Sequence, residues 1–348
     1  MANMNIFNKL RSINIEGKTI LLTHTDLDGS GPVVILKTLF PDMDLEVRHN
    51  ANGVMSHNIK DVVVNHGDEY DNIIVTDISV NDTDLEEIKN SANVDKLVLI
   101  DHHISVIHLN EYDWAVVEPG LIEDDFRAKY YKDIDPTLPR SSSATSLFYD
   151  YLVSKGLVTD SNPELELFVH QVATWDTWDW NNTFNRDMQY YTLNETFRIY
   201  GIDIFDRIYP ERFLSPEKNA EFIRQTELLL EIENSKIDSL LKRVANSFKT
   251  GYLNCNGKRY SFCLWMGSSY MSEVNDLMKK NHPGKDLYLI NYGTGIGVRS
   301  ENPDINVGEF VKQFGGGGHV GAGGFSISES MQIGYTQSAM NATFEIDE

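Results

Sequence analysis

Short runs of apolar, mostly β-branched residues alternate with amphipathic stretches over the first 130 residues of the chain. Three runs, which end at residues 23, 76 and 100, are continuous enough to be strands buried on both faces. A further strand is predicted at 44–49, and helices are predicted at 30–40, 54–65 and 81–90. Such alternation is typical of a parallel sheet with right-handed crossovers. We therefore expect an N-terminal α/β domain with a doubly wound, mainly parallel sheet.

The pattern changes after residue 140. The three serines at 141–143 precede a predicted helix, and another helix is predicted at 163–174. Ser215 and Pro216 open a long helical stretch that reaches about residue 248 and suits a connector between domains. Beyond residue 251, strands and helices alternate again. We expect a larger domain at 1–190, a helical connector at 191–250 and a smaller α/β domain at 251–348.

Composition narrows the class of protein. The 348 residues are 41% hydrophobic and 24% charged, as in ordinary soluble globular proteins, with no run of about 18 apolar residues and no signal peptide at residues 1–5. We expect Cys255 and Cys263 to be small buried side chains, and a reducing cytoplasm fits them best. The chain has a net charge of −22, from 52 acids and 30 bases. It therefore lacks the basic surface that binding of long nucleic acids requires. We expect neither long duplex nucleic acid nor a membrane as partner.

Acids and histidines follow each of the three buried runs. They are His24, Asp26 and Asp28 after the first run, Asp77 after the second, and Asp101, His102 and His103 at the third. The carboxyl ends of parallel strands face one crevice, so these side chains should meet there. Alternate residues of an extended segment share a face, which would point His24, Asp26 and Asp28 into one site. An EF-hand loop is excluded because Lys37 stands at its twelfth position.

Mixed imidazole and carboxylate ligands favour Mn²⁺, although Fe, Co or Zn also fit, whereas Mg²⁺ and Ca²⁺ prefer oxygen ligands. Two adjacent ions would polarise phosphate oxygens and lower the pKa of a shared water. A further acid is expected from the tryptophan-rich stretch at 175–180, where we prefer Asp176 to Asp179. The tryptophans either pack in the core or form a stacking platform for a base.

The glycine-rich stretch at 315–324 is the second chemical signal. A G-x-G-x-x-G match inside it does not indicate a dinucleotide site, because a helix is predicted before it and a strand after it. We interpret the stretch as a backbone nest whose amides approach a phosphate, with His319 as an additional donor. Arg299 would clamp a phosphate with two hydrogen bonds. A plain surface loop is the alternative.

Together, the two signals resemble the DHH phosphoesterase superfamily and its accompanying C-terminal domain. The motifs that carry the resemblance are His24-x-Asp26-x-Asp28-Gly, Asp77, Asp101-His102-His103 and Gly316-Gly317-Gly318-His319-x-x-Ala322-Gly323-Gly324. Gly323 departs from the family, which often has alanine there. The resemblance implies a two-domain enzyme with two Mn²⁺ ions and an active site in the interdomain cleft.

The resemblance also implies roles by position. One ion would be held by His24, Asp26 and Asp77, and the other by Asp28, Asp77, His102 and Asp176. His103 would contact the scissile phosphate, and Asp101 would orient the histidines. The terminal nucleotide would be held by Arg299, Gly317, Gly318 and His319.

The Asp-x-Trp form at Asp176 is closest to the bacterial oligoribonuclease (nanoRNase) type. RecJ-type exonucleases carry an added nucleic-acid-binding barrel, and membrane-bound cyclic dinucleotide phosphodiesterases carry transmembrane segments. We expect a cytoplasmic, Mn²⁺-dependent exoribonuclease-type phosphodiesterase that uses a metal-activated hydroxide to hydrolyse short oligonucleotides to mononucleotides. The alternatives are a cyclic or linear dinucleotide phosphodiesterase, a pyrophosphatase, and a nucleotide-sensing protein without turnover. The preference for RNA or DNA and the presence of a homodimer are left open.

Overall fold

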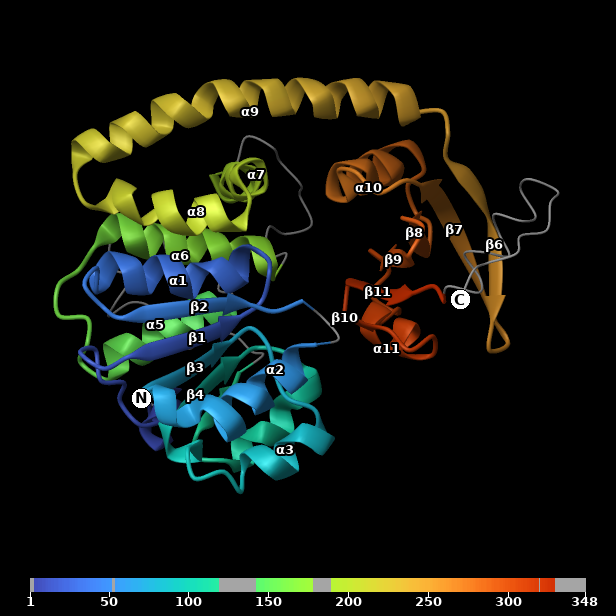
Figure 1. Cartoon of the computed structure of the whole chain (residues 1–348). Coiled ribbons are helices and arrows are strands. Elements are labelled where there is room, and N and C mark those ends of the chain that lie inside the picture. Colours follow the sequence, from blue (N-terminus) through green and yellow to red (C-terminus); the bar gives the residue numbers. More distant parts are fainter. Residues whose placement is uncertain (1–2, 52–53, 119–141, 178–188, 319, 329–348) are drawn as a thin grey trace, which may run out of the picture. The chain divides into compact units, whose positions relative to one another are not determined.

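The computed structural model describes residues 3–51, 54–118, 142–177, 189–318 and 320–328. The chain divides into two units, Met1–Leu230 and Glu231–Glu348, and each unit has its own β-sheet (Figure 1). Within the described residues, no helix combines the length and the apolar character needed to cross a membrane.

The sheet of the first unit has five parallel strands in the order β2-β1-β3-β4-β5. Its strands are β1 (Thr19–Thr23), β2 (Leu45–His49), β3 (Asn72–Thr76), β4 (Leu97–Asp101) and β5 (Ala115–Val117). Every residue of β1, β3 and β4 is buried, which explains their continuous apolar runs. Thr23 lies beside Thr76, and Thr76 beside Ile100, so the three carboxyl ends lie at one edge of the sheet.

Helices cover both faces of this sheet (Figure 1). One face packs against α1 (Leu27–Leu39), α5 (Ala144–Ser154) and α6 (Pro163–Asp176), and the other against α2 (Met55–Asp61), η2 (Val62–His66) and α3 (Asp82–Ile88). Short helical turns complete the layer: η1 (Asn3–Lys9), η3 (Gly67–Glu69), η4 (Val94–Lys96) and η5 (Ile104–Glu111). The predicted doubly wound α/β fold is confirmed.

Individual bounds were not predicted for several elements of the first unit, although the stretch at 191–250 was expected to be helical. These elements are β5, α7 (Gln189–Tyr200), α8 (Ile202–Ile208) and η6 (Pro210–Phe213). The strand β5 has three residues, too few to establish a period. The buried side of α7 includes Glu195 and Thr196, which interrupt its apolar stripe. The predicted long helix is α9 (Pro216–Val244), and its first half belongs to this unit.

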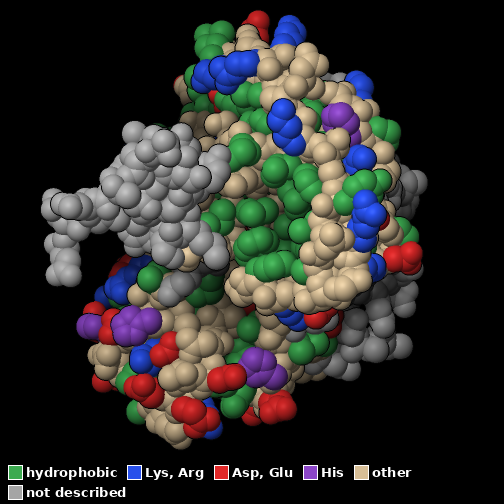
Figure 2. All heavy atoms as spheres, turned by 90° about the vertical axis from the view of Figure 1, so that its right-hand side faces the viewer, with side chains coloured by type: hydrophobic (Ala, Val, Ile, Leu, Met, Phe, Trp, Pro, Cys, Tyr) green, Lys and Arg blue, Asp and Glu red, His purple; other side chains and the backbone are tan. Residues whose placement is uncertain are grey.

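The second unit is a mixed six-stranded sheet in the order β10-β11-β9-β8-β7-β6. Its strands are β6 (Lys249–Cys255), β7 (Lys258–Met266), β8 (Leu287–Asn291), β9 (Gly295–Arg299), β10 (Gly317–Gly318) and β11 (Ala322–Ser326). The end of α9 and α10 (Met271–Asn281) pack on one face, and α11 (Val307–Lys312) packs on the other. Figure 2 shows apolar side chains gathered on one face of this unit.

The prediction of a second, smaller α/β domain is thus confirmed, although β6 was not predicted. Residues of β6 alternate between exposed and half-buried positions, so the strand lacks an apolar run. Of the two cysteines, Cys263 is buried as expected, whereas Cys255 at the end of β6 is partly exposed.

Candidate metal centre

The first group of candidate ligands lies where β1 leads into α1. The helix starts at Leu27, three residues earlier than predicted, because the Asp26 side chain caps it and accepts a hydrogen bond from the Gly29 amide at 3.0 Å. Asp28 therefore lies in the first helical turn, and the expectation of an extended segment from His24 to Asp28 is wrong. Gly29 permits this tight entry, because a Cβ there would lie 2.3 Å from the His24 carbonyl oxygen.

His24, Asp26 and Asp77 form one compact cluster. His24 Nδ1 lies 2.7 Å from Asp26 Oδ2 and 3.8 Å from Asp77 Oδ2. Burial opposes ionisation of Asp26, but its hydrogen bonds with His24 and the Gly29 amide lower the pKa of this carboxyl to about 2. The ligand atoms of the three residues lie within 4.8 Å of one another, close enough to share one cation.

A second cluster surrounds His102. Its Nε2 atom lies 3.4 Å from Asp77 Oδ1, 3.4 Å from Asp176 Oδ2 and 3.7 Å from Asp28 Oδ2. Asp176 is the last residue of α6, so the helix delivers its carboxylate to the carboxyl edge of the sheet. Asp77 turns one oxygen toward each cluster, which is the arrangement that a ligand shared by two ions requires.

The crowding of these buried carboxyl groups favours the binding of cations between them. Burial, together with the charges of neighbouring aspartates, holds the pKa of Asp77 and of Asp176 well above the usual range. Asp176 also lies at the C-terminal end of a helix, where the dipole disfavours an anion. Among the described residues, no hydrogen bond reaches the buried Oδ2 atoms of Asp77, Asp101 and Asp176. Divalent cations would satisfy the oxygens of Asp77 and Asp176 and neutralise the crowded negative charge.

Asp28 is held by a helix far away in the chain. Its Oδ2 and Oδ1 accept hydrogen bonds from the amides of Ala144 and Thr145 at 2.8 and 2.9 Å, at the N-terminus of α5. The Thr145 hydroxyl donates to the Asp28 carbonyl at 2.8 Å. The predicted serine cap of α5 is present at Ser143, but the sequence did not indicate that this helix start receives Asp28.

Asp101 arranges the two histidines through one oxygen. Asp101 Oδ1 accepts from the amides of His102 and His103 at 2.7 and 3.2 Å, and it lies 2.7 Å from His103 Nδ1. Asp101 therefore contacts His102 through the backbone amide. It contacts His103 through both the backbone amide and the ring, and so fixes the orientation of that ring. Burial disfavours the charged ring, but the bond to Asp101 outweighs it and raises the pKa of His103 to about 9.

One supporting pair was missed by the sequence analysis. His49 at the end of β2 places Nδ1 2.6 Å from the His24 carbonyl oxygen and Nε2 2.7 Å from Asp206 Oδ2 on α8. Lys37 donates to the Asp206 carbonyl at 3.0 Å. The sequence gave no signal for His49, because it is a single histidine at the end of a weakly apolar strand and its partner lies 157 residues away.

A cavity of about 490 Å³ opens beside the clusters. Apolar side chains from three segments line it, namely Met55, Ile78, Val80 and Val106. Polar side chains between them are Ser56, Ser79, Asn81 and Ser105. No lysine or arginine is among its described lining residues, so an anionic ligand would depend on cations at the clusters and on His103.

The second unit carries the other predicted residues. Gly317 and Gly318 form a short strand paired with β11, rather than the turn-like nest that was expected. Arg299 ends β9, and its Nη1 donates to the carbonyls of Val298 and Gly323. Burial lowers the pKa of Arg299 to about 10, so the group stays charged at neutral pH. His319 lies outside the described residues.

Asp179, Trp178 and Trp180 also lie outside the described residues. Trp175, on α6, packs against the hydrophobic core with its ring centroid 6.0 Å from that of Tyr191. For this tryptophan, core packing is the role that the structure supports.

No family model matches the chain. Over 318 residues, the chain is 30% identical to the oligoribonuclease NrnB of Bacillus subtilis (strain 168), an alignment that covers 89% of this chain and 73% of that protein. This chain belongs to the DHH phosphoesterase superfamily. As a member of it, the chain is a hydrolase of the phosphodiesterase type.

Two solved structures are similar over most of their length. The exonuclease RecJ bound to manganese is 14% identical, with a TM-score of 0.49 and coverage of 98% of this chain and 94% of that one. The pGpG-specific phosphodiesterase PggH of Vibrio cholerae is 16% identical, with a TM-score of 0.47 and coverage of 93% and 98%.

Proposed function

We propose that this chain is a Mn²⁺-dependent phosphodiesterase that removes mononucleotides from short oligonucleotides. The observation that carries the proposal is Asp77, which directs one oxygen to the His24 cluster and the other to the His102 cluster. The similarity to an enzyme named oligoribonuclease supports the choice of substrate.

The proposed ligands divide between the two clusters. His24, Asp26 and Asp77 would hold one ion, and Asp28, Asp77, His102 and Asp176 would hold the other. When bound, divalent ions would polarise phosphate oxygens and supply a hydroxide near neutral pH. The imidazole nitrogens favour Mn²⁺ over Mg²⁺.

The protein itself would position the substrate. His103 lines the cavity beside the clusters, with its ring fixed by Asp101. In the cationic form that Asp101 favours, His103 would donate a hydrogen bond to a phosphate oxygen. The apolar wall from Met55 to Val106 suits a nucleoside next to the scissile phosphate, which inorganic pyrophosphate would not use. In the second unit, we propose that Arg299, Gly317, Gly318 and His319 bind the terminal nucleotide.

The experiment is product analysis with end-labelled oligoribonucleotides of about 2 to 10 residues, cyclic dinucleotides and pyrophosphate. Each is incubated with metal-stripped protein and with protein that has received Mn²⁺ or Mg²⁺. We expect mononucleotides from the linear oligomers, a faster rate with Mn²⁺ and no turnover without metal. Exclusive cleavage of cyclic dinucleotides or of pyrophosphate would refute the proposed substrate class.

A further inference from the structure

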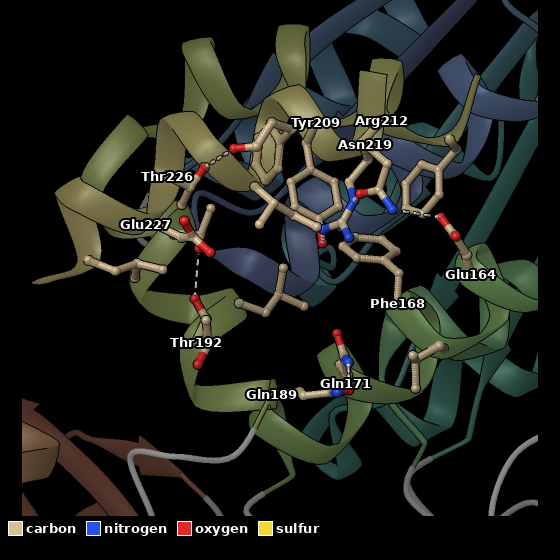
Figure 3. Close-up of a pocket in the computed structure, with 17 residues that line it drawn as sticks. Glu164, Phe168, Gln171, Gln189, Thr192, Tyr209, Arg212, Asn219, Thr226 and Glu227 are labelled. Carbon is tan, nitrogen blue, oxygen red and sulfur yellow. Dashed lines mark hydrogen bonds between the residues drawn. The ribbon is translucent and has the colours of Figure 1, made fainter. Parts of the chain in front are cut away.

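A second cavity lies in the helical layer of the first unit. It is lined by α6, α7, η6 and the first half of α9 (Figure 3). Its volume is about 430 Å³, within the range of about 300–1,000 Å³ that is usual for small-molecule sites. None of its described lining residues is a candidate metal ligand, so the proposed hydrolysis does not account for it.

One wall of this cavity is aromatic. The rings of Phe168, Tyr209, Phe213 and Phe222 contact one another, with centroids 5.2–6.1 Å apart. Arg212 lies 4.9 Å from the Tyr209 ring centroid and donates to the Tyr209 hydroxyl at 2.8 Å. Such a wall suits a planar, uncharged ring system.

Phosphate is a poor ligand for this cavity. Arg212 is the only lysine or arginine among the described lining residues, and it donates to Tyr209 and Asn219. Glu164 and Glu227 also line the cavity, and both are exposed. Their carboxylates would repel an anionic ligand.

Two glutamines provide the hydrogen bonds that a ligand would need. Gln171 Nε2 donates to Gln189 Oε1 at 2.7 Å, and Figure 3 shows the two side chains next to each other. Gln171 Oε1 and Gln189 Nε2 have no hydrogen bond in the part of the chain that the structure describes. They present an acceptor and a donor side by side, which matches the edge of a nucleobase.

We propose that this cavity binds a nucleoside through its base, at a site separate from the metal centre. The aromatic wall would contact the ring, and the glutamine pair would recognise its polar edge. Helix α6 connects the two places, because Phe168 and Gln171 lie on the helix that ends at Asp176. A ligand held between α6 and α9 would therefore restrain the helix that carries a residue of the metal centre.

The test is equilibrium dialysis of the full chain with each of the four ribonucleosides, in EDTA so that metal does not contribute. We expect saturable binding of one nucleoside per chain with a Kd below about 1 mM. Gln171→Leu removes the acceptor at nearly constant volume and should weaken binding about tenfold. Gln225→Leu, on an exposed part of α9 outside the cavity, is the matched control and should bind normally.

A second pair of variants separates blocking of the cavity from misfolding. Ile223 and Leu228 are 43% and 62% exposed on the same helix, but only Ile223 lines the cavity. Ile223→Trp should abolish binding, and Leu228→Trp should not. Asp77→Asn should retain nucleoside binding, because it alters only the metal centre. Absence of saturable binding, equal binding by Ile223→Trp and wild type, or loss of binding in Asp77→Asn would each overturn the proposal, whatever the result for oligonucleotide hydrolysis.

Discussion

Asp77 combines two unfavourable features in one residue. Its φ angle of 59° lies in the left-handed region, where a residue other than glycine costs about 1–3 kcal/mol. Its carboxyl group is buried beside other aspartates, which raises its pKa well above the usual range. Neither feature helps the fold. The backbone conformation and the buried position do, however, direct one carboxyl oxygen of Asp77 toward each cluster. The local cost is consistent with a residue kept for its chemistry.

Asp77→Asn should abolish activity without harming the fold. Asparagine tolerates the left-handed conformation, so the backbone is unchanged, while the shared negative charge is lost. We expect a loss of activity of more than about 100-fold, since even residues behind metal ligands cost 10–100-fold. In EDTA the variant should melt at a higher temperature than wild type, because one buried charge is removed.

Thermal melting with and without Mn²⁺ checks this prediction. The wild type should gain stability with Mn²⁺, by about 2.7 kcal/mol at 100 times the Kd, and the variant should gain much less. An active variant, or an equal gain in both proteins, would rule out the shared role of Asp77.

His49 should act on the metal centre through the backbone of His24. Its two short contacts join the His24 carbonyl to Asp206 on α8. We expect His49→Ala to lower Mn²⁺ affinity by about 10–100-fold, as is typical for residues that hold metal ligands in place. Asp206→Asn, which keeps an acceptor for Nε2, should have a smaller effect.

Calorimetric titration with Mn²⁺ measures this effect directly. His66→Ala is the matched control, because the His66 side chain is 46% exposed and forms ion pairs with the nearby surface acids Asp61 and Glu69. Wild-type affinity in His49→Ala would contradict the role of this pair.

At the scale of elements, the metal centre depends on close packing of α1 against α5. Asp28 on α1 accepts both amides at the start of α5, and Gly31 lets the helices approach. The sequence predicted strands β1 to β4 in their chain order and the site residues that follow β1, β3 and β4, because buried parallel strands leave clear apolar runs. It did not predict contacts such as Asp28 with Thr145, or His49 with Asp206, because those depend on tertiary packing and leave no local period. The early start of α1 was missed because Asp26 serves both as cap and as candidate ligand.

Gly31→Ala tests that packing. Alanine normally stabilises an exposed helix interior by about 1 kcal/mol relative to glycine. Here the added Cβ would lie 1.9 Å from the Thr145 hydroxyl oxygen, so the helices must move apart. We expect a loss of about 1–3 kcal/mol in the free energy of unfolding, measured in urea, together with weaker Mn²⁺ binding. An increase in stability would show that the approach of the helices is not required.

At the scale of the whole molecule, the boundary between the two units could not be located from the pattern of hydrophobic and polar residues. The structure divides the chain between Leu230 and Glu231, inside α9, and that helix continues without a break in its sequence. The boundaries at 190 and 250 remain predictions. Net charge, in contrast, can be read directly: 52 acids against 30 bases give −22. A surface of this charge repels every phosphate that is not held at a specific site.

Length dependence tests the central claim, which is specificity for short oligonucleotides. The measurement is kcat/KM with Mn²⁺ for an RNA dinucleotide, a pentanucleotide and a strand of about 24 nucleotides, each at two salt concentrations. We predict that the long strand is used no better than the pentanucleotide and that its salt dependence is shallow, because its outer phosphates gain no contacts. A tenfold or larger advantage for the long strand, with a steep loss of rate as salt rises, would contradict the account.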